Sequence, residues 1–202
     1  PVSTRELYQE AVRRDGMRMN LLAAVVDGDF DITYYRVSPY LRNGAGPVEP
    51  LNIEISEKDA MDVHGGGLVA FSGNIRKEAT REGLGKNIGR SLLLSIEERS
   101  YLTGKKPGNR IEDLRELVYR DLGSRGFLVK TGFKYGTHFR VYTSGDIDDH
   151  SDLLVHCVEG DHRFTWEELS RTIRLSNSVR KRMLFAFNDG EDQVRYLMLG
   201  WT

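Results

Sequence analysis

Apolar residues recur at helical spacing between residues 111 and 123, where every third or fourth position is hydrophobic. The apolar positions on this face are Ile111, Leu114, Val118 and Leu122. This pattern predicts an amphipathic helix. Asn109 followed by Glu112 is typical of a helix start, and Gly123 to Gly126 predict the helix end.

The residues after this helix predict strands. Two strand-like runs, Phe127–Lys130 and Phe133–Tyr142, meet around Gly132. In the second run Phe139 and Val141 alternate with polar neighbours, as residues do in a strand with one buried face.

The next segment predicts a loop, a buried strand and a helix. Residues 143–150 are polar and predict the loop, and the continuous apolar run Leu153–Val158 predicts the strand. Thr165 and Glu168 predict a capping box at the start of the helix. The apolar side of this helix is expected to carry Trp166, Leu169 and Ile173.

The end of the chain predicts a hairpin. A strand from Met183 to Phe187 is followed by Asn188-Asp189-Gly190, a sequence that favours a tight turn. The last strand is expected to present Val194, Tyr196 and Met198 on one face. These elements together predict a compact mixed α/β domain.

Upstream, residues 51–72 predict short strands that are interrupted by Gly65-Gly66-Gly67, and residues 91–103 predict a helix. Turn-rich sequences at 43–47 and 107–109 indicate boundaries. We therefore expect three parts: a tail with a helix and a strand hairpin over 1–45, a small α/β domain over 46–108, and a larger domain over 109–202.

The beginning of the chain repeats its end at an offset of 162 positions. The matching pairs are Ala24 with Ala186, Asp27 with Asp189, Gly28 with Gly190, Asp29 with Glu191, Ile32 with Val194, and Tyr34 with Tyr196. Hairpins with Asp-Gly turns are common, so the turn alone is weak support for a repeat. The match also extends back to Arg18 and Arg180, although Met19 stands opposite Lys181.

Composition narrows the class of protein. The 202 residues are 39% hydrophobic and 29% charged, which allows a buried core and excludes disorder by composition. No run approaches the roughly 18 apolar residues of a membrane span, so no membrane partner is expected. The single cysteine, Cys157, excludes a disulfide framework, and a reducing, cytoplasmic location is the default expectation.

The net charge of −1 hides a segregated pattern. Residues 171–182 contain five basic residues and no acidic one, namely Arg171, Arg174, Arg180, Lys181 and Arg182. Small polar residues lie among these cations, which suits phosphate contacts better than solubility alone, although a solvated face is the alternative. Residues 146–161 contain six acidic residues and no lysine or arginine, and predict either a docking loop or two ordinary polar loops.

Familiar catalytic motifs are missing from the sequence. The five histidines have no metal-binding spacing, and neither a phosphate-binding glycine loop nor a nucleophile elbow occurs. We therefore expect no metal and no cofactor, and Cys157 is expected in the core. Tyr142, His150 and Lys181 remain as candidates, with packing, exposure and solvation as their ordinary alternatives.

Several blocks over residues 110–202 resemble the catalytic domain of tRNA splicing endonucleases. The blocks are Tyr119–Leu122, Arg125–Gly132, Lys134–Tyr142, His150–Ser151 with Leu154–Val155, and Ser178–Lys181 with Met183–Leu184. Residues 91–104 resemble the helical end of that family's N-terminal domain. The resemblance implies a mixed α+β fold in which a small N-terminal α/β domain precedes a catalytic domain with a central mixed sheet and flanking helices.

In that family a tyrosine, a histidine and a lysine cleave RNA without a metal. The resemblance implies that Tyr142 is the general base for the 2′-hydroxyl, His150 the general acid for the leaving 5′-oxygen, and Lys181 the cation that stabilises the phosphate. The products would be a 2′,3′-cyclic phosphate and a 5′-hydroxyl. Because the pKa of a free tyrosine is about 10, we expect a nearby cation such as Lys181 to lower the pKa of Tyr142.

The resemblance also implies the substrate, a precursor tRNA whose intron junctions form a bulge–helix–bulge. Arg174 matches the position of the family's bulge-clamping arginine, and pairing with a carboxylate is the alternative. Arg171 and Arg180 are expected to contact the same RNA.

Two cuts require two active sites, so the resemblance implies a two-fold assembly with other copies or fragments of the same enzyme. Glu159 and Asp161 lie in a loop that resembles the family's acidic docking loop. Residues 1–45 would be the tail of a non-catalytic structural unit. We therefore expect the chain to be the C-terminal part of a longer, fused polypeptide.

Two other functions stay open. The first is a non-catalytic architectural or RNA-binding subunit of the same complex, and the intact set Tyr142, His150 and Lys181 argues against it. The second is a metal-dependent nuclease, which needs carboxylates clustered on strands. The acidic residues here are expected mainly in loops, so this hypothesis ranks last.

Overall fold

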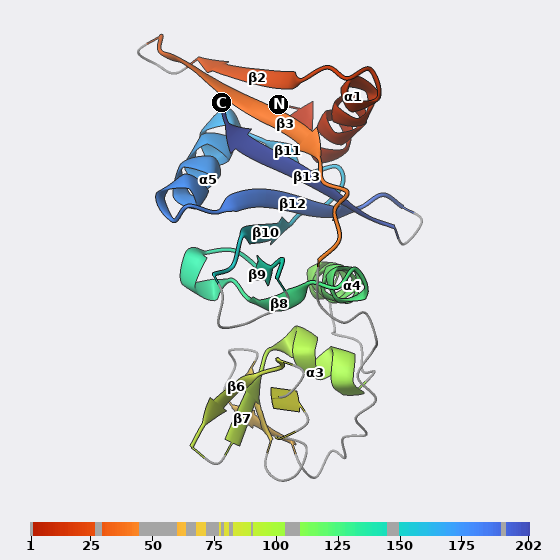
Figure 1. The fold of residues 1–202 in the computed structure, drawn as a ribbon, viewed down its shortest axis with the longest axis vertical. Coiled ribbons are helices and arrows are strands. Elements are labelled where there is room, and N and C mark those ends of the chain that lie inside the picture. The colour runs from red at the N-terminus through yellow and green to blue at the C-terminus, as the bar shows by residue number, and fades with distance from the viewer. Residues whose placement is uncertain are drawn as a thin grey trace. The chain divides into compact units, whose positions relative to one another are not determined.

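The computed structural model forms two units (Figure 1). It describes residues 2–26, 30–44, 60–63, 68–71, 77, 79–80, 83–89, 91–103, 110–144, 150–190 and 193–202. The first unit consists of residues 1–43, 132–141 and 151–202, and the second of residues 44–131 and 142–150. The two units are described separately below.

A seven-stranded mixed sheet has the strand order β2-β3-β13-β12-β10-β9-β8. Its strands are β2 Leu21–Val26, β3 Ile32–Pro39, β8 Leu128–Thr131, β9 Phe139–Tyr142, β10 Leu153–Cys157, β12 Arg182–Asn188 and β13 Val194–Trp201. β10 and β12 run parallel, whereas β9 with β10, β12 with β13, β13 with β3 and β3 with β2 run antiparallel. The expected mixed sheet with flanking helices is therefore confirmed.

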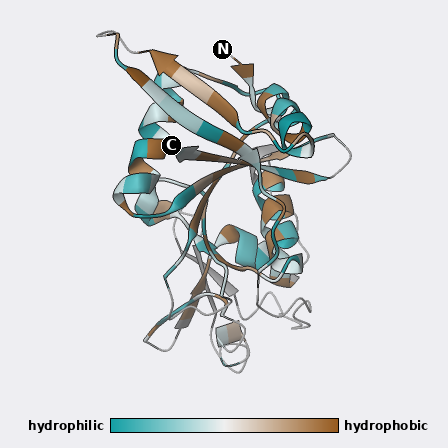
Figure 2. Cartoon of the chain, turned by 45° about the horizontal axis from the view of Figure 1, so that its top comes forward, coloured by the Kyte–Doolittle hydropathy of each residue, from teal (hydrophilic) through white to brown (hydrophobic). Residues whose placement is uncertain are grey.

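Two helices, α1 Thr4–Gly16 and α5 Trp166–Ser178, cover one face of this sheet. Each helix has one buried side, and Figure 2 shows the helices alternating between the hydrophobic and hydrophilic colours. The buried cluster joins the two helices to the strands. Its members include Leu7, Tyr8 and Ala11 from α1, Leu169 and Ile173 from α5, and Met183, Phe185, Leu197 and Leu199 from the strands.

The sequence repeat extends to the structure, because α1-β2-β3 and α5-β12-β13 are equivalent elements in the same order. Ser3 and Thr165, at equivalent positions, are the N-caps of the two helices, and each accepts a backbone hydrogen bond from the glutamate three residues later. After the two helices, the equivalent residues Arg18 and Arg180 both have positive φ angles, 56° and 54°. The two segments therefore share their helix starts and their helix ends.

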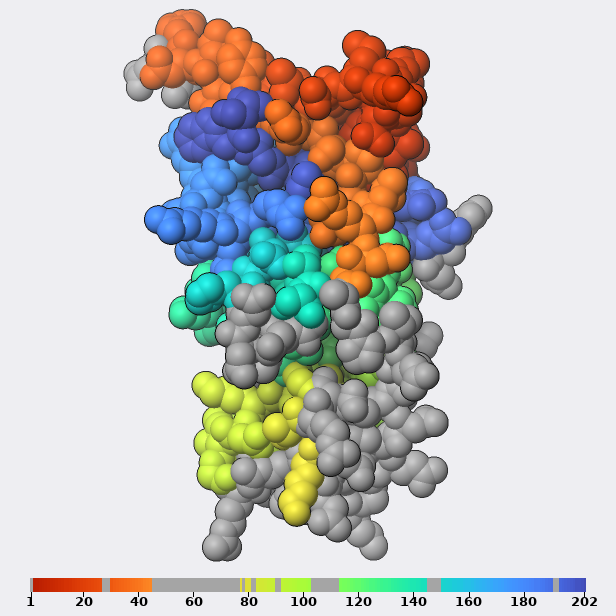
Figure 3. All heavy atoms as spheres, viewed as in Figure 1, coloured from red at the N-terminus to blue at the C-terminus, as the bar shows by residue number. Residues whose placement is uncertain are grey.

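The two repeats are related by a pseudo-two-fold axis. In the antiparallel pair of β3 and β13, Val37 lies opposite its own equivalent, Leu199. The short strands β1, Val2–Ser3, and β11, Arg163–Phe164, pair in the same way, with Val2 opposite Phe164. Figure 1 shows α1 and α5 on either side of β3 and β13, and Figure 3 shows the atoms of the two repeats in contact.

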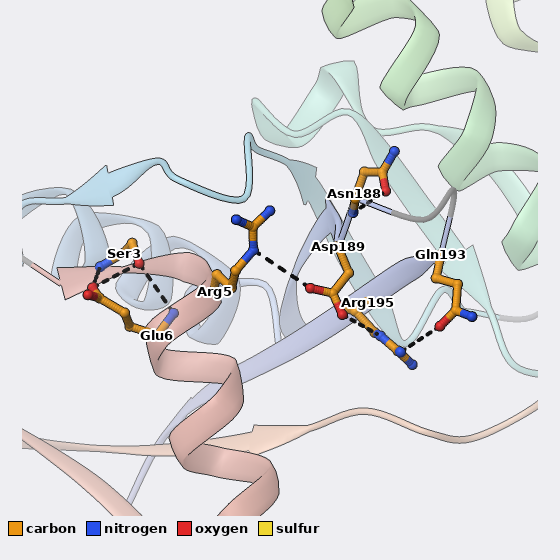
Figure 4. A network of polar contacts seen from close by, with 8 residues as sticks. Ser3, Arg5, Glu6, Asn188, Asp189, Gln193 and Arg195 are labelled. Atoms are coloured by element: carbon orange, nitrogen blue, oxygen red, sulfur yellow. Dashed lines mark hydrogen bonds and ion pairs between the residues drawn. The ribbon is translucent and has the colours of Figure 1, made fainter.

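A polar contact connects the start of α1 in the first repeat to the turn after β12 in the second (Figure 4). Arg5 at the start of α1 lies 3.6 Å from Asp189 in the turn after β12, measured from Nε to Oδ1. Asp189 also accepts a hydrogen bond from Arg195 on β13. The turn itself lies where the Asp-Gly sequence predicts it, and Gly190 has a φ of 106°, which favours glycine.

The repeats differ in what covers their outer face. Leu22 and Tyr34 are 51% and 47% exposed, whereas the equivalent Leu184 and Tyr196 are 0% and 2% exposed. β12 also pairs with β10, while among the described residues β2 is the last strand of the sheet. The outer face of β2 and β3 is therefore an exposed apolar surface, which we call the uncovered face.

The second unit contains a four-stranded antiparallel sheet with the order β4-β5-β7-β6 and two helices. These elements are β4 Ala60–Val63, β5 Leu68–Phe71, β6 Lys86–Ile88, β7 Ser91–Leu94, α3 Ile96–Thr103 and α4 Arg110–Ser124. α4 confirms the helix expected over 111–123. Of the strands predicted over 51–72, the parts at β4 and β5 are confirmed. Residues 51–59 and Gly65-Gly66-Gly67 lie outside the described residues, as do the boundary at 107–109 and the cap at Asn109.

Three expectations need correction. The helix expected over 91–103 begins only at Ile96, because Ser91–Leu94 pair as β7 with β5 and β6. Ser95 and Glu98 form reciprocal hydrogen bonds between side chain and backbone, which fix the helix start after the strand. On α5, Trp166 is partly exposed at the first turn, so the buried side consists of Leu169, Ile173 and Ser176.

The third correction concerns the strand expected over 133–142. Its first part is a single 3₁₀ turn, η2 Phe133–Tyr135, and only Phe139–Tyr142 form β9. Gly136 after the turn is left-handed, with a φ of 65°. A Cβ atom at Gly132 would lie 2.8 Å from the backbone carbonyls of Thr137 and Phe139, so the chain there turns tightly instead of extending.

A buried ion pair joins α3 to β8 inside the second unit. Lys130 Nζ lies 2.9 Å from Glu98 Oε1, and both side chains are buried. Lys130 also donates to the Gly85 carbonyl, and Glu98 accepts from the Gly85 amide. Both charges therefore have hydrogen-bond partners away from water.

Replacing Glu98 by alanine is expected to destabilise the second unit by about 3 kcal/mol, because Lys130 would keep a buried charge without its partner. Denaturant unfolding of Glu98→Ala, Lys130→Met and the double variant tests this prediction. The double variant should recover the part of the loss that comes from the unpaired charge of Lys130, while the loss of the bonds from the Ser95 and Gly85 amides to Glu98 remains. A loss in the double variant equal to the sum of the single losses would contradict a coupled pair.

Candidate active site

Three strand ends meet at one edge of the sheet in the first unit. Val141 of β9 lies opposite Leu153 of β10, which lies opposite Arg182 of β12. Because β9 runs against β10 and β12 runs with it, the end of β9 lies beside the starts of β10 and β12. We call Val141, Leu153 and Arg182 the strand-end row.

The predicted catalytic residues adjoin this row in the chain. Tyr142 directly follows Val141, and Lys181 directly precedes Arg182. His150 precedes Leu153 by three residues. Backbone hydrogen bonds from Asp152 N to the Val141 carbonyl and from Arg182 N to the Asp152 carbonyl hold the row together, at 3.0 Å each.

Among the three predicted catalytic residues, Lys181 is held by contacts of both its side chain and its backbone. Its ammonium group donates a hydrogen bond to the carbonyl of Ser151, the residue next to His150. The same Nζ lies 5.6 Å from the centroid of the Tyr135 ring, within cation–π range. The Lys181 amide donates to the Ser176 carbonyl at 2.8 Å, so the end of α5 fixes the backbone of Lys181.

Tyr142 and His150 have different environments. Tyr142 is the last residue of β9 and is buried. His150 is exposed and follows residues 145–149, which lie outside the described residues, so the predicted loop over 143–150 is described only in part. The catalytic roles of Tyr142, His150 and Lys181 stay predictions.

The predicted RNA-binding arginines lie on and just after α5. Arg171 and Arg174 are exposed on the helix, away from its buried side, and Arg180 is exposed in the turn that leads to Lys181. The basic run therefore presents cations to solvent along α5 and up to Lys181, which adjoins the strand-end row in the chain. Contact with RNA stays a prediction for each of them.

The predicted docking loop packs against the start of α1. The Thr4 amide donates to the His162 carbonyl and the Arg5 amide donates to the Gly160 carbonyl, both at 3.0 Å. Within this loop Glu159 is half-buried and Asp161 is exposed. Their role at an interface stays a prediction.

The histidines near the core have structural roles. His138 Nδ1 accepts a hydrogen bond from the Cys157 amide at 2.9 Å, and the rings of His138 and His156 lie 4.6 Å apart. Burial lowers the pKa of His156 below its usual value. Cys157 is buried, as expected. Among the described residues, no three metal-binding side chains gather in one place.

Sequence reasoning missed two features of the site. The sequence pattern predicts a strand at Tyr135, but this residue lies in the η2 turn, which brings its ring to Lys181. The Ser151 carbonyl, which accepts from Lys181, is a backbone group with no sequence signal. The glycines at 132 and 136, three residues apart around Phe133–Tyr135, were the available signal for the turn.

The helices of the described part are too short or too polar to cross a membrane.

The chain is similar in sequence to known tRNA-splicing endonucleases. Residues 113–196 match the tRNA intron endonuclease family, catalytic C-terminal domain. The chain is 34% identical over 224 residues to a tRNA-splicing endonuclease of Methanococcoides burtonii and 30% identical over 226 residues to that of Methanosarcina mazei. These alignments cover 96% and 99% of this chain, and 63% of each relative.

A shorter relative matches only part of the chain. The tRNA-splicing endonuclease of Thermococcus onnurineus is 39% identical over 109 residues, which cover 54% of this chain and 62% of the relative. The chain therefore spans less than two thirds of the length of each of these relatives.

Proposed function

Since residues 113–196 match the tRNA intron endonuclease family, catalytic C-terminal domain, we propose that this chain carries the active site of an endonuclease that excises introns from precursor tRNA. The supporting observation is the strand-end row, whose chain neighbours are Tyr142 and Lys181. The bond from Lys181 to Ser151 adds to this support, because Ser151 is the chain neighbour of His150.

The proposed reaction needs two proton transfers and one cation. Tyr142 accepts the proton of the 2′-hydroxyl, whose oxygen attacks the adjacent phosphorus. The bond from phosphorus to the 5′-oxygen breaks, and His150 gives that oxygen a proton. Lys181 stabilises the extra negative charge on the non-bridging oxygens. The products are a 2′,3′-cyclic phosphate and a 5′-hydroxyl, with no change in oxidation state.

The proposed substrate is a bulge–helix–bulge in precursor tRNA. Arg174 is exposed on α5 seven residues before Lys181, and an exposed guanidinium can stack on an unpaired base. Arg171 and Arg180 would contact neighbouring phosphates, whose charge they neutralise.

The proposed assembly has two active sites related by a two-fold axis, with Glu159 and Asp161 at the contact between pairs. Within one pair, residues 1–45 would be the tail of a structural unit. The exposed Leu22 and Tyr34 support this, because their equivalents in the catalytic repeat are buried. We propose that the uncovered face receives the rest of that structural unit, including a strand that lies parallel to β2 as β10 does to β12.

Cleavage of a bulge–helix–bulge pre-tRNA in excess EDTA tests the proposed function. The full-length protein is expected to cut both junctions at the same rate with and without EDTA and to leave cyclic-phosphate ends. The reason is that side chains supply the acid, the base and the cation. Cleavage restored only by Mg²⁺ would contradict the mechanism. Tight RNA binding without any cleavage would instead favour an architectural subunit.

A further inference from the structure

The η2 turn holds an aromatic side chain in the solvent. Phe133 is 88% exposed, and exposed apolar residues are ordinary on protein surfaces. Its backbone, however, is closely held. The Tyr135 amide donates to the Gly132 carbonyl at 2.7 Å and the Gly136 amide donates to the Phe133 carbonyl at 3.0 Å.

The base of this turn is equally fixed. The Gly132 amide donates to the His138 carbonyl at 2.9 Å, and the Thr137 hydroxyl donates to the Phe139 carbonyl at 3.2 Å. Gly132 has no room for a Cβ atom. The turn therefore presents the ring of Phe133 from a rigid backbone, so that binding a ligand would order little of the chain.

The chain around Phe133 carries basic residues, and two lysines lie near the ring of Tyr135. Lys134 is exposed, and its Nζ lies 5.8 Å from the centroid of the Tyr135 ring. Lys181 Nζ lies 5.6 Å from the centroid of the same ring. Between residues 131 and 142 the chain contains Lys134, His138 and Arg140 but no acidic residue. Proteins that bind single-stranded nucleic acid combine exposed aromatic rings, on which bases stack, with cations that contact the backbone.

We propose that Phe133 is a stacking platform for an unpaired RNA base next to the cleaved phosphate, and that Lys134 contacts a neighbouring phosphate. Tyr135 is a positioning residue, because its ring faces the ammonium group of Lys181 and connects the platform to the proposed catalytic cation. This inference rests on the proposed function and adds a second contact to the unpaired nucleotides, on a different element from Arg174.

The test uses full-length protein and a bulge–helix–bulge RNA with 2-aminopurine at successive bulge positions. Stacking on Phe133 should quench the fluorescence of one position. Phe133→Ala should abolish that quenching and raise the Kd about 10-fold. Phe133→Trp should restore binding, because it keeps a stacking ring.

Phe30→Ala is the matched control. Phe30 is 85% exposed but lies before β3, away from the η2 turn in the sequence, and its loss should leave the Kd and the quenching unchanged. Because the Phe133 ring is exposed, Phe133→Ala should also melt at the wild-type temperature, so that a change in binding reports contact with RNA.

The possible outcomes distinguish failure of the stacking role of Phe133 from failure of the proposed endonuclease function. Wild-type binding and quenching by Phe133→Ala, in a protein that still cleaves, would overturn the stacking role and leave the proposed function intact. A smaller oligomer in Phe133→Ala with unchanged quenching would assign Phe133 to a protein contact and overturn the inference. If the wild-type protein neither binds nor cuts the RNA, both proposals fail.

Discussion

Replacing Lys181 by alanine is expected to lower the single-turnover cleavage rate about 100- to 1,000-fold, while the Kd for RNA changes only a few-fold. The reason is that its cation acts on charge that develops only in the transition state. The measurement is single-turnover cleavage at saturating RNA, together with the Kd from filter binding. A loss confined to the Kd would contradict the catalytic role.

Two controls separate chemistry from structure. Lys86→Ala removes an exposed lysine on β6 and should leave the rate unchanged. Lys181→Cys treated with 2-bromoethylamine restores an amine of nearly the same length and should recover much of the activity. The reaction is selective because the one native cysteine, Cys157, is buried.

Replacing His150 by alanine is expected to lower the cleavage rate about 100- to 10,000-fold, because a 5′-oxygen that leaves without a proton is a poor leaving group. His150 is exposed, so little stability should be lost with its side chain. His162→Ala, which removes a half-buried histidine beside Glu168, is the control and should retain cleavage. An equal loss in both variants would contradict a specific role for His150.

The sequence pattern was sufficient for the elements in which periodicity and burial agree. α4 lies where helical apolar spacing predicts it, and β10 lies where a continuous apolar run predicts a buried strand. The repeat was also visible in the sequence, and its positive-φ positions, Arg18 and Arg180, were its most informative match. Their shared backbone geometry explains why the similarity extends beyond the hairpin turn.

The pattern failed where a short element ends inside an apolar or aromatic run. Ser91–Leu94 read as helix because it continues into α3, and only pairing with β5 and β6 makes it a strand. Phe133–Tyr135 read as strand because aromatic residues favour strands, and the tight contacts of Gly132 override that preference. Such local choices are set by tertiary contacts.

The site could be predicted only in part for a similar reason. Residue types and order pointed to Tyr142, His150 and Lys181 through the resemblance. The strand-end row depends on the order and direction of β9, β10 and β12, which the sequence does not state. The contacts of Lys181 with a backbone carbonyl and with Tyr135 depend on the same arrangement.

His150 and Lys181 are proposed to have different roles at the same phosphate: His150 protonates the leaving oxygen and Lys181 stabilises the negative charge. The most direct measurement is single-turnover cleavage of an RNA in which the leaving 5′-oxygen is replaced by sulfur, which leaves readily without a proton. His150→Ala is expected to cleave this RNA nearly as fast as the wild type, whereas Lys181→Ala remains slow. A His150→Ala variant that stays as slow on the sulfur substrate as on the normal RNA would contradict the role of His150 as the general acid.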